Sequence, residues 1–283
     1  MKGAISYAVF GYNKPQPQNC FSFDSYFRGI ALCVRVNRII YPGWINIINI
    51  DNSSYNSPYK GYLDWLVQKG LVKVNICKDA PLCMAMLWRM KPIFDTDSGG
   101  NWLYTHILCR DIDSVGTFRE AQAVAQWIQE DKTIHCITDS ISHTIPMMGG
   151  MIGFRPHYIT EKLSVKTWQQ LINMGTFDWN RKGTDQDFLN KYVYPNCTDS
   201  ATEHFVLGMR HNLKEEDGRH YSIPNIDINV DREFEADLNA LAGHIGASGA
   251  YTTPMERFLK DIDPYRDEYK EIEGKFKSVF YWA

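Results

Sequence analysis

Two aspartates one residue apart, Asp111 and Asp113, directly follow an apolar run over residues 103–109 that reads as a buried strand. Carboxylate oxygens are ligands that Mg²⁺ and Mn²⁺ prefer, and these ions keep open positions for phosphate oxygens. Ligands of open α/β sheets bind at the carboxyl ends of the strands. The pair therefore predicts a metal-bridged diphosphate site. The structural alternative is that the two side chains cap the following helix.

A second Asp-x-Asp motif, formed by Asp95 and Asp97, has a different context. No strand precedes it, and it runs directly into Gly99 and Gly100. Aspartates in such a position commonly accept hydrogen bonds from their own backbone. We therefore interpret this motif as a surface turn. Arg119, on the helix after the first motif, is predicted either to meet a phosphate or the Asp pair, or to lie at the surface.

Strands and helices must alternate to position the first pair. The hydrophobic pattern predicts strands over residues 4–10, 44–50, 71–77, 103–109 and 133–137, and helices over residues 23–40, 59–69, 81–90 and 118–129. Such alternation indicates βαβ units with right-handed crossovers and a mostly parallel, Rossmann-like sheet flanked by helices. After Pro146 the pattern changes to glycine-rich loops with helices over residues 164–173 and 185–193. Residues 261–277 read as a solvated helix face.

Composition limits the classes of protein that need to be considered. A net charge of −3 gives no electrostatic reason to expect a nucleic-acid partner, and no run of about 18 apolar residues predicts a membrane span. The first residues lack the pattern of a signal peptide, so the cytoplasm is the expected compartment. Seven cysteines without a Cys-x-x-Cys pair indicate buried free thiols rather than a disulfide framework or a zinc site.

Three ordered motifs give the sequence a resemblance to a known family. They are Arg110-Asp111-Ile112-Asp113-Ser114, Met148-Gly149-Gly150-Met151-Ile152-Gly153 and Gly183-Thr184-Asp185-Gln186. Their order and spacing resemble those of glycosyltransferases with the GT-A fold, found in bacteria and large DNA viruses. The resemblance is good over about residues 100–200. It implies a single GT-A-like catalytic domain over 1–283, with a nucleotide-binding half (1–115), a donor-sugar and acceptor half (116–205) and a C-terminal acceptor-side extension (206–283).

The resemblance implies that Asp111 and Asp113 hold Mn²⁺ or Mg²⁺ against the donor diphosphate, with Asp111 also reaching the ribose. A histidine late in the chain is commonly the third metal ligand in this fold. His244 is the preferred candidate because its glycine-rich surroundings, including Gly246, offer backbone N–H groups to a diphosphate. His204 is the other candidate. The chain has Thr198-Asp199-Ser200 where the family often has His-Asp-Ser.

The donor side of the site is implied in the same way. The glycine-rich motif would lie beside the donor sugar, because glycine lets backbone approach a ligand closely; a tight strand-to-turn connection is the alternative. Arg89 matches a position that faces the donor, although a solvated place on an amphipathic helix is equally open. The positions implied to bind the donor are Tyr7, Val9, Arg89, Arg110, Asp111, Gly149, Gly150, Met151 and Gly246.

Three residues are implied in catalysis. Asp185, in the family's Asp-Gln pair with Gln186, is the best candidate for contacting the reacting sugar or for accepting the proton of the acceptor hydroxyl. The alternative is that Thr184 or Asp185 caps the helix. Asp139, with His143 nearby, is a candidate for contacts to sugar or acceptor hydroxyls, and a structural role is the alternative for both.

The sequence thus predicts a metal-dependent glycosyltransferase that moves a sugar from a UDP- or GDP-sugar, with a UDP-sugar favoured, to a hydroxyl acceptor. A glycan is the expected acceptor, and the cytoplasm (of the host, for a viral protein) the expected compartment. One alternative is a metal-dependent phosphoryl or nucleotidyl transferase, which is weakened by the absence of a P-loop motif. The other is a non-catalytic sugar-binding relative.

Overall fold

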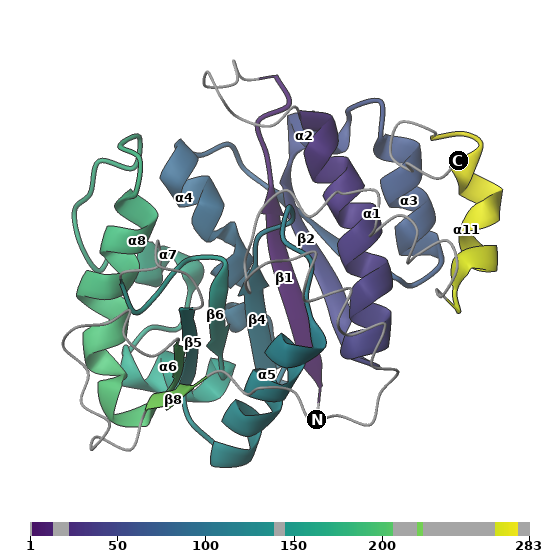
Figure 1. Cartoon of the computed structure of the whole chain (residues 1–283). Coiled ribbons are helices and arrows are strands. Elements are labelled where there is room, and N and C mark those ends of the chain that lie inside the picture. Colours follow the sequence, from purple (N-terminus) through teal and green to yellow (C-terminus); the bar gives the residue numbers. More distant parts are fainter. Residues whose placement is uncertain (1, 14–22, 139–144, 206–219, 223–263, 277–283) are drawn as a thin grey trace.

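A single mixed β-sheet with helices on both faces organises the chain (Figure 1). The computed structural model describes residues 2–13, 23–138, 145–205, 220–222 and 264–276. Eight strands follow the order β3-β2-β1-β4-β6-β5-β7-β8, and β6 alone among them runs antiparallel to its two neighbours. The predicted α/β class with a mostly parallel, Rossmann-like sheet is therefore confirmed.

The strands are β1 (Gly3–Val9), β2 (Ile45–Asp51), β3 (Val72–Cys77), β4 (His106–Arg110), β5 (Ile134–Thr138), β6 (Met151–Phe154), β7 (Ala201–Phe205) and β8 (His220–Ser222). The α-helices are α1 (Phe23–Ile40), α2 (Asn52–Tyr55), α3 (Lys60–Gln68), α4 (Leu82–Met86), α5 (Phe118–Glu130), α6 (Pro156–Lys162), α7 (Trp168–Ile172), α8 (Thr184–Phe188) and α11 (Arg266–Glu273). The 3₁₀-helices are η1 (Leu87–Phe94), η3 (Tyr194–Asn196) and η4 (Thr198–Ser200), and η2 (Leu189–Val193) is a π-helix.

The strand order reverses beside β1. From β1 the chain winds outward through β2 to β3, and it then returns to the other side of β1 with β4. In open α/β sheets, such a reversal leaves a crevice outside the carboxyl ends of the two diverging strands, and ligands bind there. Asp111 directly follows β4, so the predicted metal-binding motif lies at this switch point.

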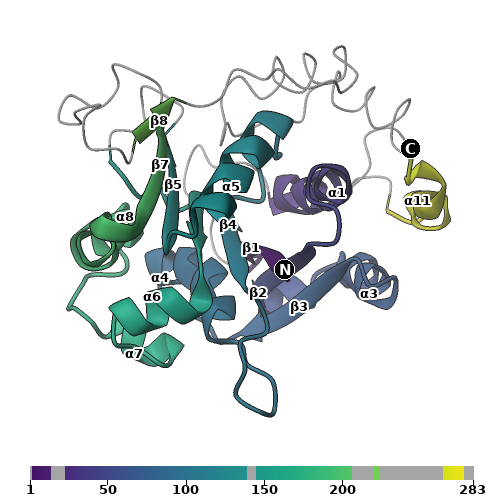
Figure 2. The same ribbon diagram turned by 90° about the horizontal axis from the view of Figure 1, so that it is seen from below.

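Each face of the sheet carries its own helices, as Figure 2 shows. Each of the two helical layers also has its own cluster of buried hydrophobic side chains. Helices α1, α3, α5 and α11 pack on one face, and η1, α6, α7 and α8 pack on the other. The side chains of β4 alternate between the two layers, as strand geometry requires. Leu108 belongs to the first core, whereas Ile107 and Cys109 belong to the second. Arg110 therefore shares the face of Leu108.

Most of the predicted elements in the first half of the chain are found within a few residues of their expected bounds. The second half differs. Residues 151–154 were read as part of a glycine-rich loop but form β6, a strand too short to show a period, in which Gly153 faces the Trp127 ring. The helix predicted from residue 164 begins only at Trp168, because Ser164 has a positive φ and Thr167 caps the helix by accepting from Gln170 N–H.

Two minor predictions are confirmed. Asp97 accepts hydrogen bonds from the N–H groups of Gly99 (2.8 Å) and Asn101 (2.9 Å), so the second Asp-x-Asp motif is a self-capped turn. The six cysteines in the described ranges, Cys33, Cys77, Cys83, Cys109, Cys136 and Cys197, are buried free thiols. Among the helices that the structure describes, none has the length and apolar composition needed to cross a bilayer.

Two buried histidines join β5, β7 and α5. The Nε2 atom of His135 lies 2.9 Å from Nδ1 of His204, and Nε2 of His204 lies 3.0 Å from Oε1 of Gln126. Nε2 of Gln126 donates to Glu130 (3.1 Å), which fixes the orientation of the amide. Because an amide oxygen only accepts, His204 must carry its proton on Nε2 and accept from His135 through Nδ1. Burial lowers the pKa of both imidazoles, so both rings are neutral near pH 7.

This network predicts a loss of stability in mild acid. Burial lowers the pKa of His204 to about 4, whereas an unfolded chain protonates histidine near pH 6.5. Between these values the unfolded state binds more protons, so the free energy of unfolding falls as the pH falls. The difference corresponds to about 3 kcal/mol, present above pH ~6.5 and lost toward pH ~4. Urea unfolding of His204→Gln between pH 7 and 4 should show a shallower decline than that of the parent.

The exposed His157 provides the matched control, since His157→Gln should leave the pH dependence of the parent unchanged. An equally steep decline in the parent and in His204→Gln would contradict the assignment of a neutral buried His204.

Candidate functional site

An ion pair lies at the carboxyl end of β4. Arg89, on η1, donates through Nη1 to Oδ1 of Asp111. The Arg89 side chain is 4% exposed and is held from behind by its Nε atom, which donates to the carbonyl of Met86 (2.8 Å). The Asp111 side chain is 47% exposed. The Asp111 carboxylate is therefore exposed to solvent, while the Arg89 guanidinium that pairs with it is buried. The alternative prediction that Arg89 is a solvated residue on an amphipathic helix is wrong.

A glycine turn closes over this pair. Gly149 and Gly150 are buried and lead directly into β6, which is hydrogen-bonded to β4. A Cβ atom at Gly150 would overlap the Asp111 carboxylate, and one at Gly149 would lie 3.2 Å from Nη2 of Arg89. Only glycine leaves space for the turn to approach so closely. The motif is thus both a strand-to-turn connection and a wall of the site.

Asp185 reaches the same place from α8. A Cβ atom at Gly149 would lie 3.4 Å from Oδ2 of Asp185, and this oxygen is buried without a hydrogen-bond partner among the described residues. Burial raises the pKa of Asp185, while the nearby Arg89 guanidinium opposes the rise. The capping alternative is wrong, because Gly183 is the N-cap residue of α8 and the Thr184 hydroxyl donates to the carbonyl of Asp178.

Asp113 lies beside Asp111 on the side of α1. Burial, followed by the negative charge of Asp111, raises the pKa of Asp113 to about 6. The sulfur atom of Cys33 lies 3.5 Å from the carbonyl oxygen of Ile112 and 3.4 Å from that of Ser114, so its one S–H group is shared between the carbonyls on either side of Asp113. Neither aspartate caps α5, because the Thr117 side chain accepts from Glu120 N–H. The N-cap alternative is therefore wrong.

The carboxylates fit a divalent cation by their chemistry. Asp111 and Asp113 repel one another, and Asp185 presents an oxygen with no donor, so positive charge would stabilise all three. Within the described ranges, no three His, Cys, Asp or Glu side chains are grouped closely enough to hold a metal by themselves. Phosphate oxygens or water would have to complete the coordination of a cation held by Asp111 and Asp113.

Three predicted donor contacts are placed elsewhere. Arg110 points toward α5, where Nε donates to Oε1 of Glu120 (2.7 Å) and Nη1 donates to the carbonyls of Cys109 and Ile152 (both 2.8 Å). Tyr7 and Val9 are each 1% exposed in the core beneath α1. The positions of Arg110, Tyr7 and Val9 therefore do not support contacts from their side chains to a donor.

Other predicted residues divide between the site and regions outside it. Gln186 follows Asp185 on α8 and is half-buried, whereas Met151 is buried against Ile137 and Met148. Both ring nitrogens of His204 are engaged in the buried histidine network, so it is not available as a metal ligand. The remaining predicted positions, Asp139, His143, His244 and Gly246, lie outside the described residues.

Sequence reasoning missed Asp51 at the end of β2. Its Oδ2 accepts from Gly11 N–H (2.6 Å), and its Oδ1 accepts from Ser54 N–H (2.6 Å) and the Ser53 hydroxyl (2.7 Å). Burial alone would raise the pKa of Asp51, but these hydrogen bonds outweigh it and lower the pKa. Asp51 therefore fixes the start of the loop after β1, at the switch point. An Asp before Asn-Ser-Ser at a strand end was the available signal.

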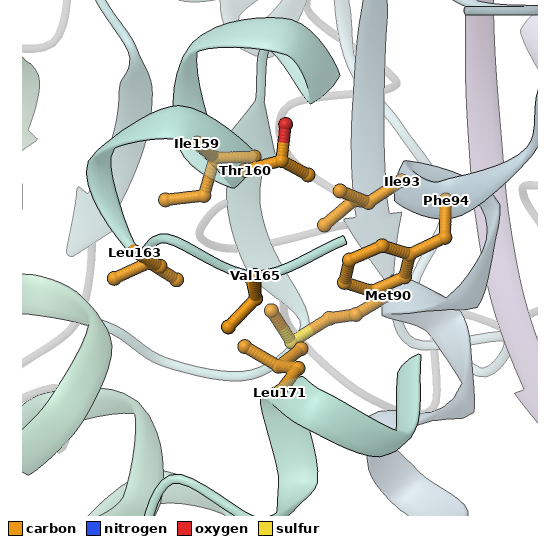
Figure 3. A pocket seen from close by; sticks show the side chains of 8 residues that line it. All are labelled: Met90, Ile93, Phe94, Ile159, Thr160, Leu163, Val165 and Leu171. Atoms are coloured by element: carbon orange, nitrogen blue, oxygen red, sulfur yellow. The ribbon is translucent and has the colours of Figure 1, made fainter. Parts of the chain in front are cut away.

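An apolar pocket lies on the η1 side of the sheet, away from Asp111 (Figure 3). Met90, Ile93 and Phe94 of η1 face Ile159 of α6 and Leu171 of α7 there. The space between these side chains is too small to hold even a water-sized molecule. It belongs to the packing of this helical layer.

A scan against protein-family models finds no match for the sequence, and a search of the curated proteins finds none either. The geometry of the site is therefore the basis for assigning a function.

The glycine turn generates a graded prediction. Gly150→Ala should displace the Asp111 carboxylate and destabilise the fold by about 1–3 kcal/mol through overpacking, whereas Gly149→Ala should have a smaller effect. Gly274→Ala is the control, because a Cβ atom there meets no atom within 4 Å. Urea unfolding measures stability, and titration with Mn²⁺ measures cation binding. Equal Mn²⁺ affinity in Gly150→Ala and the parent would contradict the contact with Asp111.

Proposed function

We propose that the chain is a metal-dependent GT-A-type glycosyltransferase that moves a sugar from a nucleotide-diphosphate donor, a UDP-sugar by preference, to a hydroxyl acceptor. One observation carries the proposal: the Asp111 carboxylate, exposed at the switch point of the sheet, is surrounded by Arg89, the Gly149–Gly150 turn and Asp185. These groups come from four segments of the chain. Convergence of charged groups and bare backbone on one edge is the expected form of a diphosphate site.

The chemistry defines what these residues must do. In the transfer, the bond between the anomeric carbon and the phosphate oxygen breaks, and a bond from the acceptor oxygen to the anomeric carbon forms. The diphosphate leaves with the bonding electron pair, and the acceptor hydroxyl loses its proton. Asp111 and Asp113 would hold a divalent cation, which when bound would supply positive charge to the leaving diphosphate. The Arg89 guanidinium is a second, fixed positive charge beside it.

Asp185 is the candidate for contact with the donor sugar or for taking the proton of the acceptor. Its Oδ2 is the buried oxygen that has no donor among the described residues, and it faces the glycine turn. Because the turn consists of glycines, no side chain of its own stands between it and Asp185. A hydroxyl of the sugar or of the acceptor would supply the missing hydrogen bond to Asp185.

The first test concerns Asp113. Release of nucleoside diphosphate from a panel of UDP- and GDP-sugars, with Mn²⁺ or EDTA, should show metal-dependent turnover of one donor by the parent. Asp113→Ala should abolish metal-dependent donor binding and turnover, because it removes half of the cation's protein ligands. Asp97→Ala is the matched control, since Asp97 belongs to the self-capped turn.

Full activity of Asp113→Ala would contradict the metal assignment. If the parent neither binds nor hydrolyses any donor, and Mn²⁺ has no effect on binding, the glycosyltransferase proposal itself fails.

The second test concerns Asp185. Asp185→Asn should lower turnover by about 10²–10⁴-fold with a much smaller change in donor affinity, if the carboxylate acts in the transition state. Asp187→Asn, two residues along on α8, removes a carboxylate that pairs with Arg181 at the surface and should leave turnover unchanged. Steady-state kinetics and donor titration separate the two effects. Equal turnover in both variants would remove Asp185 from the mechanism.

A further inference from the structure

The side chain of Asn190 joins the glycine turn to the helix that carries Asp185. Its Oδ1 accepts from the N–H of Met147 (3.0 Å), and its Nδ2 donates to the carbonyl of Met147 (2.9 Å) and to the carbonyl of Gln186 (2.8 Å). Only one orientation of the amide satisfies all three contacts, because a flipped amide would set its oxygen against two carbonyls. The three bonds therefore define the position of the turn on the helix.

One backbone hydrogen bond, from Met151 N–H to the carbonyl of Met148 (2.8 Å), closes the turn on the side of β6, and Asn190 anchors it on the side of Met147. Gly149 and Gly150 have no side chains to hold them, and glycine is the residue with the greatest backbone freedom. Met147, just before them, is fully buried, and both its N–H and its carbonyl bind Asn190. The position of the glycines relative to Asp111, Arg89 and Asp185 thus depends on a residue that touches none of the proposed reacting groups.

The helix that carries Asp185 changes its hydrogen-bonding pattern at Asn190. Asn190 belongs to η2, a π-helical segment that directly continues α8. Segments of this kind are rare and occur frequently at functional sites. Here the Asn190 side chain binds both the carbonyl of Gln186 and the backbone of Met147, so one side chain connects the helix of Asp185 to the turn.

We propose that Asn190 is a positioning residue that sets the distance between the Gly149–Gly150 turn and Asp185. A Cβ atom at Gly149 would lie 3.4 Å from Oδ2 of Asp185 and 3.2 Å from Nη2 of Arg89. The turn is therefore packed closely against both side chains, and a shift of the turn would change these contacts. Displacements of about 1 Å at a reacting centre reduce rates by about 10²-fold. The consequence for catalysis rests on the proposed function, whereas the consequence for the turn does not.

The test uses Asn190→Ala and Asn190→Asp in the full chain. Asn190→Ala removes all three bonds, whereas Asn190→Asp keeps an acceptor for Met147 N–H but sets a carboxylate against two carbonyls. The matched controls are Asn196→Ala and Asn196→Asp. Asn196 donates to the carbonyl of Tyr192 (2.8 Å), four residues earlier, as Asn190 does to Gln186, but within the described residues none of its hydrogen bonds reaches the turn.

Hydrogen exchange gives the first readout, which does not depend on any reaction. Exchange of the Met147 amide should rise by about tenfold or more in Asn190→Ala and stay at the parent level in Asn196→Ala. Steady-state kinetics give the second readout: both Asn190 variants should lose about tenfold or more in kcat, with little change in KM for the donor. A purely structural role would lower thermal stability alone.

The outcomes separate the two proposals. Parent-level exchange at Met147 in Asn190→Ala overturns the positioning role, whatever the enzyme does. Faster exchange with unchanged kcat also overturns it, because the turn would then move without affecting the reaction. If the parent has no transferase activity, the proposed function fails, and the exchange measurement alone decides whether Asn190 positions the turn.

Discussion

The site depends on how a buried guanidinium is compensated. Arg89 is almost fully enclosed, and an enclosed cation is tolerated only when it is paired and hydrogen-bonded. Its partners come from Met86 at the end of α4, from Asp111 after β4 and, through electrostatic attraction, from Asp185 on α8. This one charge therefore constrains three segments that are distant in sequence. The glycine turn can then close over the pair, because it brings no side chain of its own.

The two arginines near the Asp-x-Asp motif have separate tasks because strand residues alternate between faces. Arg110, the last residue of β4, points to the α5 layer and pairs with buried Glu120, which also accepts from the hydroxyl of Tyr41 (2.9 Å). Removing one partner of such a buried pair destabilises a fold by about 3–5 kcal/mol. Arg89 reaches Asp111 from the opposite layer. One arginine thus holds the sheet to a helix, and the other supports the exposed carboxylate.

Asp51 and Asn190 show how the edge of the sheet is given a defined shape. Each binds backbone groups of a loop whose glycine would otherwise leave it mobile: Asp51 binds Gly11 after β1, and Asn190 binds Met147 before the glycine turn. The oxygens of the Asp51 carboxylate and the amide of Asn190 are hydrogen-bonded to neighbouring groups of the protein, so both side chains have a structural role. Preorganisation of this kind is what the proposed binding of a nucleotide-sugar would require.

The sequence by itself determined the α/β class, the strands that precede Asp111, the self-capped turn at Asp97 and the free thiols, because hydrophobic periodicity and turn chemistry are local properties. It also singled out Asp111, the glycine turn and Asp185. Only the tertiary structure decided that Arg110 faces α5 and that Tyr7 is buried in the hydrophobic core. It also decided that His204 is hydrogen-bonded to buried neighbours and that residues 151–154 form a strand. Those outcomes depend on which face a side chain points to and on partners that lie between 10 residues (Arg110 and Glu120) and 78 residues (His204 and Gln126) away, and no local pattern records either.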